Sequence, residues 1–215
     1  QQEEAISYLA GFINHYIADS ICHPYVYGRI GYPVDAPTSM HHGMHAHLEN
    51  ELDAILLWKY KKKKPSEFNQ TATICLNGQE IQFLASCINE TYYPITYRNN
   101  FQVTPAMVHR SIWALRFGCR TLSDKNGKKK FGIAQVESIF VNHPVASAKM
   151  VTDSVTDYRS SCNLNHEAWG NPWDPTRVST ASFVDLFHET LDKCSRVYAL
   201  LNSAVTDNMP LDKQD

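Results

Sequence analysis

Histidine and carboxylate side chains recur at four-residue spacing in the first fifty residues of this chain. His15, Asp19 and His23 form one set, and His45 with Glu49 forms a second. Side chains four residues apart on an α-helix lie on the same face, about one turn above each other. Each set therefore predicts a helix that carries imidazoles and carboxylates along one stripe. Both groups are ligands of metal ions.

The types of these ligands favour zinc in a catalytic site. Imidazole nitrogens and carboxylate oxygens, without thiolates, are typical of zinc sites in which water keeps one position open. Water bound to such a zinc ion has a pKa of about 7 and supplies a hydroxide nucleophile at neutral pH. Two neighbouring metal ions can also bind the attacking and the leaving oxygen when a phosphate ester is hydrolysed. A hydrogen-bonded pair would explain a single His-x3-Asp motif. Five matching positions predict a metal-assisted hydrolase instead.

Two helices must position these residues. We expect the first over residues 3–22, ended by Pro24, and the second over residues 44–60. Apolar residues at helical spacing accompany both stripes and predict that the ligands are buried with them. In the first helix they are Tyr8, Leu9, Phe12, Ile13, Tyr16 and Ile17, and in the second Leu48, Leu52, Ile55 and Leu56.

Several nearby residues leave alternatives open. His47 and Glu51 offer a competing register on the second helix. Asp53, one turn beyond Glu49, either orients a ligand histidine or faces solvent. For His41, His42 and His47 the simplest interpretation is an exposed turn, and a role at the rim of the site is the alternative. The other histidines are expected to have structural roles: His109, His143, His166 and His188.

The segments His15-Tyr-Ile-Ala-Asp19, Cys22-His23-Pro24 and His45-Ala-His-Leu-Glu49-Asn-Glu-Leu-Asp53 resemble the bacterial zinc-dependent phospholipase C family and the related single-strand nucleases of the same fold. The resemblance implies a mostly α-helical bundle that binds one to three zinc ions. In it, His15 and Asp19 would hold one or two ions, and His23, His45 and Glu49 another. The implied reaction is hydrolysis of phospholipids to diacylglycerol and a phosphorylated head group. A nuclease or nucleotidase of the same fold is the alternative.

The beginning of the chain bears on activity. Members of this family need further zinc ligands before the first of these helices, and this chain opens at Gln1 without a methionine. We therefore expect that the amino-terminal segment of the protein is missing from the sequence, and the general base stays unassigned. A non-catalytic helical domain that binds one zinc ion is the other alternative.

Composition predicts a single domain over residues 1–215, because 215 residues with 43% hydrophobic content suffice for one sizeable core. A net charge of −2 predicts no stable complex with nucleic acid and no strong attraction to anionic lipid. Two basic runs, Lys59 with Lys61–Lys64 and Lys125 with Lys128–Lys130, could favour an anionic surface, but a helix end and an exposed turn are the simpler interpretation. The expected partner is a phospholipid or another phosphodiester, with transient contact to a membrane surface. Six scattered cysteines weakly favour the cytoplasm, although a missing amino terminus could have carried a secretion signal.

The rest of the chain predicts further helices and one β-hairpin. Asn77-Gly78 between short alternating runs indicates a hairpin over residues 73–83. Thr104-Pro105 opens a helix with Val108, Ile112, Leu115 and Cys119 facing inward. We expect two more helices over residues 133–158 and 181–205, with a loop at residues 171–175 because of its two prolines.

Overall fold

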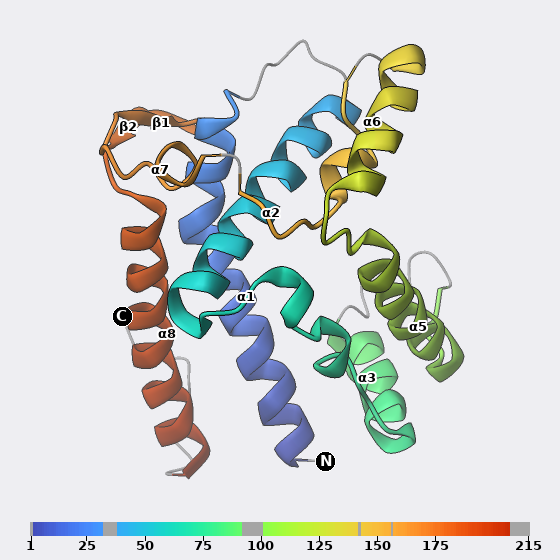
Figure 1. The fold of residues 1–215 in the computed structure, drawn as a ribbon. Coiled ribbons are helices and arrows are strands. Elements are labelled where there is room, and N and C mark those ends of the chain that lie inside the picture. The colour runs from blue at the N-terminus through green and yellow to red at the C-terminus, as the bar shows by residue number, and fades with distance from the viewer. Residues whose placement is uncertain (1, 32–37, 92–100, 142, 156, 207–215) are drawn as a thin grey trace. The chain divides into compact units, whose positions relative to one another are not determined.

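The computed structural model describes residues 2–31, 38–91, 101–141, 143–155 and 157–206. Helices make up most of them and confirm the mostly α-helical fold (Figure 1). The chain divides into two compact units. The first comprises residues 1–5 and 56–154, and the second comprises residues 6–55 and 155–215. The single domain expected from composition stays a prediction.

The second unit consists of helices and one small sheet. Its elements are most of α1 (Gln2–Arg29) and α2 (Thr38–Lys61), then α7 (Tyr158–Ser161), β1 (Trp169–Asn171), β2 (Asp174–Ser179) and α8 (Phe183–Thr206). Helix α8 lies beside α1 (Figure 1), where the Tyr198 hydroxyl donates to the carbonyl oxygen of Ala10 at 3.0 Å. Helices distant in sequence thus form one core.

Helix α1 continues through Pro24, so the prediction that it ends there is wrong. A proline inside a helix costs about 3 kcal/mol, because one hydrogen bond is lost and the ring clashes with the preceding turn. The residues that follow are fully buried: Tyr25 is 0% and Val26 1% exposed. The ring of Tyr25 packs edge-on against Trp169, with centroids 5.3 Å apart. Burial of this extra turn offsets the cost of the proline.

The sheet of this unit lies where a loop was predicted. Strands β1 and β2 are antiparallel, with Trp169 opposite Ser179 and Asn171 opposite Asp174. Pro175 is tolerated in β2 because each strand of a two-stranded sheet has a free edge that needs no N–H donor. Gly28 of α1 meets this sheet so closely that a Cβ atom would collide with the carbonyl oxygen of Gly170. Glycine is therefore required there.

The predicted burial of the ligand stripe on α1 is only partly correct. Ile17 is buried, but Phe12 and Tyr16 are exposed. Helix α2 follows its prediction more closely, because Leu52 and Ile55 are buried in the core.

The first unit contains the remaining elements. They are η1 (Pro65–Glu67), η2 (Gln70–Ala72), α3 (Gly78–Thr91), α5 (Pro105–Leu122), α6 (Lys128–Phe140) and η3 (Ser147–Lys149). Thr104 caps α5 as predicted, since its side chain accepts a hydrogen bond from the Met107 amide. Leu115 is nevertheless exposed.

The helix predicted over residues 133–158 is instead α6, which begins and ends earlier, followed by the short η3 and α7. Glu137 explains the turn, because its carboxylate accepts hydrogen bonds from the Ser147 hydroxyl and the Ala146 amide. The helix predicted over residues 181–205 is confirmed as α8, which spans Phe183–Thr206.

The predicted hairpin over residues 73–83 is wrong, because Asn77 begins a helix. Its side-chain oxygen accepts hydrogen bonds from the amides of Gln79 and Glu80 at 2.9 and 3.0 Å. Glu80 returns the contact by accepting from the Asn77 amide at 2.6 Å. This reciprocal arrangement is a capping box. The Asn-Gly pair therefore serves as the start of α3 instead of a hairpin turn.

Replacing Asn77 by alanine tests this cap. We expect Asn77→Ala to lower the free energy of unfolding by about 1 kcal/mol, because two amides at the start of α3 lose their acceptor. Urea denaturation followed by circular dichroism measures the change. Asn202→Ala, at an exposed position in α8, is the control and should change stability by less than about 0.5 kcal/mol. Equal effects of the two substitutions would contradict the capping role.

Candidate metal centre

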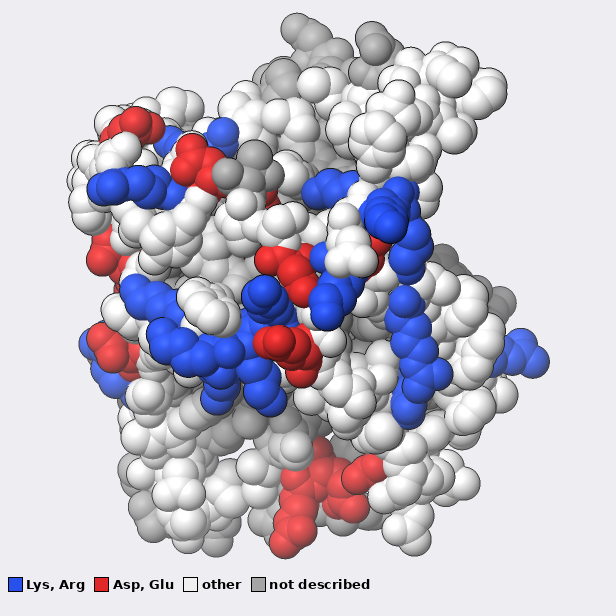
Figure 2. All heavy atoms as spheres, in the orientation of Figure 1, with Lys and Arg blue, Asp and Glu red and all other residues white. Residues whose placement is uncertain are grey.

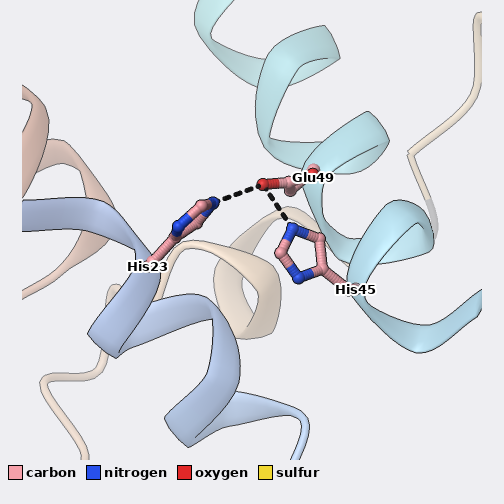
Figure 3. A group of neighbouring side chains, drawn as sticks. All are labelled: His23, His45 and Glu49. Carbon is pink, nitrogen blue, oxygen red and sulfur yellow. Dashed lines mark ion pairs between the residues drawn. The ribbon is translucent and has the colours of Figure 1, made fainter. Parts of the chain in front are cut away.

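Three of the predicted ligands converge between α1 and α2 within the second unit. Figure 3 shows His23 reaching from α1 toward Glu49, with His45 beside Glu49 on α2. The Nε2 atom of His45 lies 2.7 Å from Glu49 Oε1, and His23 Nε2 lies 3.5 Å from the same oxygen. The three ligand atoms all lie within 4.8 Å of one another. The helical spacing on α2 brings His45 and Glu49 together, and the packing of α1 on α2 adds His23.

This arrangement suits a zinc ion. Ligand atoms that bind one zinc ion at about 2.0–2.2 Å in tetrahedral geometry lie about 3.4 Å apart. The pair of His23 and Glu49 already has nearly this separation, and His45 and Glu49 need to part only slightly. Two imidazoles and one carboxylate form a set found in catalytic zinc sites, with the fourth position free for water or substrate.

His45 is the most enclosed of the three ligands. Its side chain is 15% exposed, against 31% for His23. In the described part of the chain its Nδ1 atom is buried without a hydrogen-bond partner. Its Nε2 atom faces Glu49, so Nε2 is the nitrogen that would bind a metal ion held by both side chains (Figure 3).

Aromatic rings enclose one side of the centre. Tyr27 packs edge-on against His23 and His45, with ring centroids 5.8 and 4.7 Å away. Trp173, in the turn between β1 and β2, packs against Tyr27 at 5.1 Å. Sequence reasoning gave these aromatics no role in the site. The position of Tyr27, one helical turn after His23, was the signal that could have placed it there.

His15 and Asp19 lie beside the group of three ligands. Asp19 Oδ1 is 3.8 Å from His23 Nε2, and Asp19 Oδ2 is 3.2 Å from His15 Nε2. The carboxylates of Asp19 and Glu49 therefore both lie near the same nitrogen of His23, Nε2. His15 is 75% exposed and, in the described residues, belongs to no group of three close ligands. The helical stripe predicted on α1 exists, and its solvent exposure increases toward the amino terminus.

The competing register on α2 has a structural partner. Glu51 is buried and accepts a hydrogen bond from the Ser161 hydroxyl of α7 at 2.5 Å. His47 Nε2 lies 3.9 Å from Glu51 Oε1, which is too long for a hydrogen bond. Glu51 therefore connects α2 to α7 and faces away from the candidate centre's three ligands.

The two registers can be separated by substitution. We expect Glu51→Gln to leave zinc binding intact and to lower the free energy of unfolding by about 1–3 kcal/mol, because a charge-assisted hydrogen bond in a buried site is weakened. Zinc content by elemental analysis and urea denaturation measure the two effects. Glu49→Gln is the matched variant, and we expect it to lose zinc with a smaller effect on the stability of the metal-free protein. The opposite pattern would assign the metal to the His47 register.

Asp53 makes no hydrogen bond to a ligand histidine among the described residues. Although Asp53 itself reaches solvent, desolvation by surrounding protein raises the pKa of its carboxyl to about 6, and the nearby charge of Glu49 raises it further. The predicted role of Asp53 in orienting a ligand therefore stays a prediction. The exposed turn predicted at His41, His42 and His47 is wrong, because all three lie inside α2, and of them only His42 is exposed.

Comparison with known families adds sequence evidence for the centre. A family model described as zinc dependent phospholipase C matches residues 1–100. The match covers slightly less than half of the chain, which is similar to this family over those residues. This match confirms the resemblance seen in the sequence, and the zinc-dependent phospholipase C segment contains all five predicted ligands. A search of the curated proteins and a search of the solved structures each found no match.

Proposed function

We propose that this protein is a zinc-dependent hydrolase of phospholipid phosphodiesters, with His23, His45 and Glu49 as zinc ligands. The observation that carries the proposal is the convergence of these three side chains from two helices. It coincides with the segment that matches a zinc-dependent phospholipase C family. The three converging side chains thus lie within the segment that matches the family.

The remaining predicted ligands have a place in this proposal. The Asp19 carboxylate lies 3.2 Å from His15 Nε2 and 3.8 Å from His23 Nε2, so it can accept a hydrogen bond from His15 but is too far from His23. With His15 it could bind a second ion beside the first. Zinc bound at the centre would supply positive charge for the phosphate oxygens and would acidify a bound water.

The aromatic side of the centre has a separate role. The ring of Tyr27 covers one side of the two histidines and limits the access of water there, and Trp173 packs against Tyr27. Lower local water content strengthens the attraction between a cation and its carboxylate ligand. It also offers an apolar surface to the part of a lipid next to its phosphate.

The test is an assay of the full chain on two phosphodiesters. We expect hydrolysis of a choline phospholipid in micelles, loss of activity with a chelator and recovery on adding zinc. Single-stranded DNA serves as the second substrate. Preferential cleavage of DNA would replace the phospholipase proposal with the nuclease alternative.

One observation favours a second candidate, a non-catalytic zinc-binding domain. In the described part of the chain, only one group of three ligands is close enough to share an ion. One bound zinc ion without turnover of either substrate would support this candidate. Under it, chelation would still lower the stability of the protein, because binding to the folded state alone stabilises that state.

A further inference from the structure

The exposed side of α6, in the first unit, is apolar. Phe131, Val136, Ile139 and Phe140 are between 55% and 79% exposed. Successive residues of an α-helix are about 100° apart, which places these four side chains on one continuous half of the helix surface. Large apolar side chains gathered on one exposed face indicate a surface that binds a partner.

The other side of α6 already has its contacts. Ile133 and Glu137 are half-buried, and Glu137 accepts hydrogen bonds from the Ser147 hydroxyl and amide in η3. The helix is thus attached to its own unit through one face. The apolar face is not needed to hold it there.

Two lysines lie at the amino-terminal end of this apolar face. Lys128 and Lys129 fall on the same half of the helix, and this half carries no aspartate or glutamate. Neither lysine has a carboxylate within ion-pair distance in the described residues, and Lys129 donates to the carbonyl oxygen of Thr121. Figure 2 shows lysine and arginine side chains at the base of the white surface over α6.

The position of these lysines is unfavourable without a partner. The first turn of a helix carries partial positive charge, so cations there are destabilising. The buried Asp124 accepts a hydrogen bond from the Lys130 amide at 2.7 Å and offsets part of this charge. An anionic partner at Lys128 and Lys129 would offset the rest.

We propose that Lys128, Lys129, Phe131, Val136, Ile139 and Phe140, the α6 face, bind the protein to an anionic lipid bilayer. Basic residues contact lipid phosphates while apolar side chains enter the head-group region, as in helices that lie in the plane of a membrane. Among the described helices, none is long and apolar enough to cross a membrane. The α6 face would therefore lie on the bilayer surface.

Other partners fit this face less well. A second copy of the chain, packed antiparallel on this face, would place Lys128 and Lys129 against the apolar end of the other α6, where they meet no anionic group. Nucleic acid would satisfy the lysines but would leave Ile139 and Phe140 exposed to water. The inference rests on the proposed function in one respect: membrane binding would bring a lipid-hydrolysing enzyme to its substrate. Binding itself needs no zinc.

Sedimentation of the full chain with lipid vesicles tests the inference, with a chelator present so that lipid is not hydrolysed. We expect binding to vesicles that contain phosphatidylglycerol and at least about tenfold weaker binding to pure phosphatidylcholine. Ile139→Gln with Phe140→Gln should weaken binding to the anionic vesicles at least about tenfold. Lys128→Glu with Lys129→Glu should do the same.

Two controls match these variants. Phe101→Gln changes an exposed phenylalanine of the same unit. Lys61→Glu with Lys63→Glu reverses two exposed lysines of the basic run at the end of α2, which comprises Lys59 and Lys61–Lys64. Both should change vesicle binding less than about twofold. His45→Ala should bind vesicles as the unchanged protein does, so failure of the zinc proposal and failure of the docking proposal are distinguishable. Circular dichroism checks that each variant is folded.

Four results would overturn the inference. The unchanged protein does not sediment with anionic vesicles, or the Lys61 and Lys63 variant loses binding while the α6 variants keep it. Alternatively, velocity sedimentation shows a dimer that the Ile139 and Phe140 variant dissociates, with no vesicle binding. Binding to single-stranded DNA that exceeds vesicle binding would equally overturn it.

Discussion

His45→Ala is expected to weaken zinc binding at least about 100-fold and to abolish hydrolysis of phospholipid. His45 is the most enclosed of the three candidate ligands, and its Nε2 atom lies 2.7 Å from Glu49. Loss of even an outer partner of a metal ligand costs about 10–100-fold in metal affinity, and loss of the ligand itself costs more. Elemental analysis of the purified chain and titration with zinc measure the change.

His42→Ala is the matched control for this substitution. His42 lies on the same helix but is exposed, and it belongs to no group of close ligands in the described residues. We expect unchanged zinc content in this variant. If zinc stays bound in His45→Ala, then the convergence of His23, His45 and Glu49 is not a metal site. Asp19→Ala separates the one-ion and multi-ion arrangements, because only the latter predicts fewer ions per chain.

Tyr25→Ala is expected to lower the free energy of unfolding by about 3–5 kcal/mol, the largest effect on stability that we expect of a single substitution. Tyr25 is fully buried between Trp169 and Phe183, and its hydroxyl donates to the carbonyl oxygen of Ser161 at 2.6 Å. Burial raises the pKa of this hydroxyl, so it stays protonated and remains a donor. The substitution removes ring packing and leaves a buried carbonyl without its partner. Urea denaturation measures the loss.

Two further variants divide this effect. Tyr25→Phe removes only the hydroxyl and should cost about 1–3 kcal/mol. Tyr16→Ala, on the exposed side of the same helix, should change stability by less than about 0.5 kcal/mol. Similar losses for Tyr25→Ala and Tyr16→Ala would mean that the second unit does not have its core where the structure places it. Because Tyr25 is two residues from His23, its loss should also weaken zinc binding.

Local patterns were reliable where neighbouring residues alone decide the structure. Thr104-Pro105 predicted the start of α5, because a capping side chain and a proline act within one turn. The same kind of reasoning failed at Asn77-Gly78. An asparagine before a glycine suits a hairpin turn and a helix cap equally well, and Glu80 decided for the helix through its hydrogen bond to the Asn77 amide.

Other errors arose because distant parts of the chain pack together. Pro24 does not end α1, since the next residues are buried against β1 and α8. The loop predicted over residues 171–175 is only the turn at residues 172–173, since Asn171 and Asp174 already pair as strand residues and Pro175 is accommodated in β2. The register of His47 and Glu51 could not be distinguished from that of His45 and Glu49 by spacing. The structure distinguishes them because the hydroxyl of Ser161, more than a hundred residues away, donates a hydrogen bond to Glu51.

The sequence by itself determined that histidines and carboxylates share one stripe on each of two helices, because four-residue spacing and the helical repeat are local properties. It also carried a resemblance to the zinc-dependent phospholipase C family, whose model matches residues 1–100. Only the tertiary structure decided which stripes face each other. It joined His23 to His45 and Glu49, left His15 in solvent and exposed the apolar face of α6. The side of a helix that packs inward depends on partners far along the chain, and no local pattern encodes it.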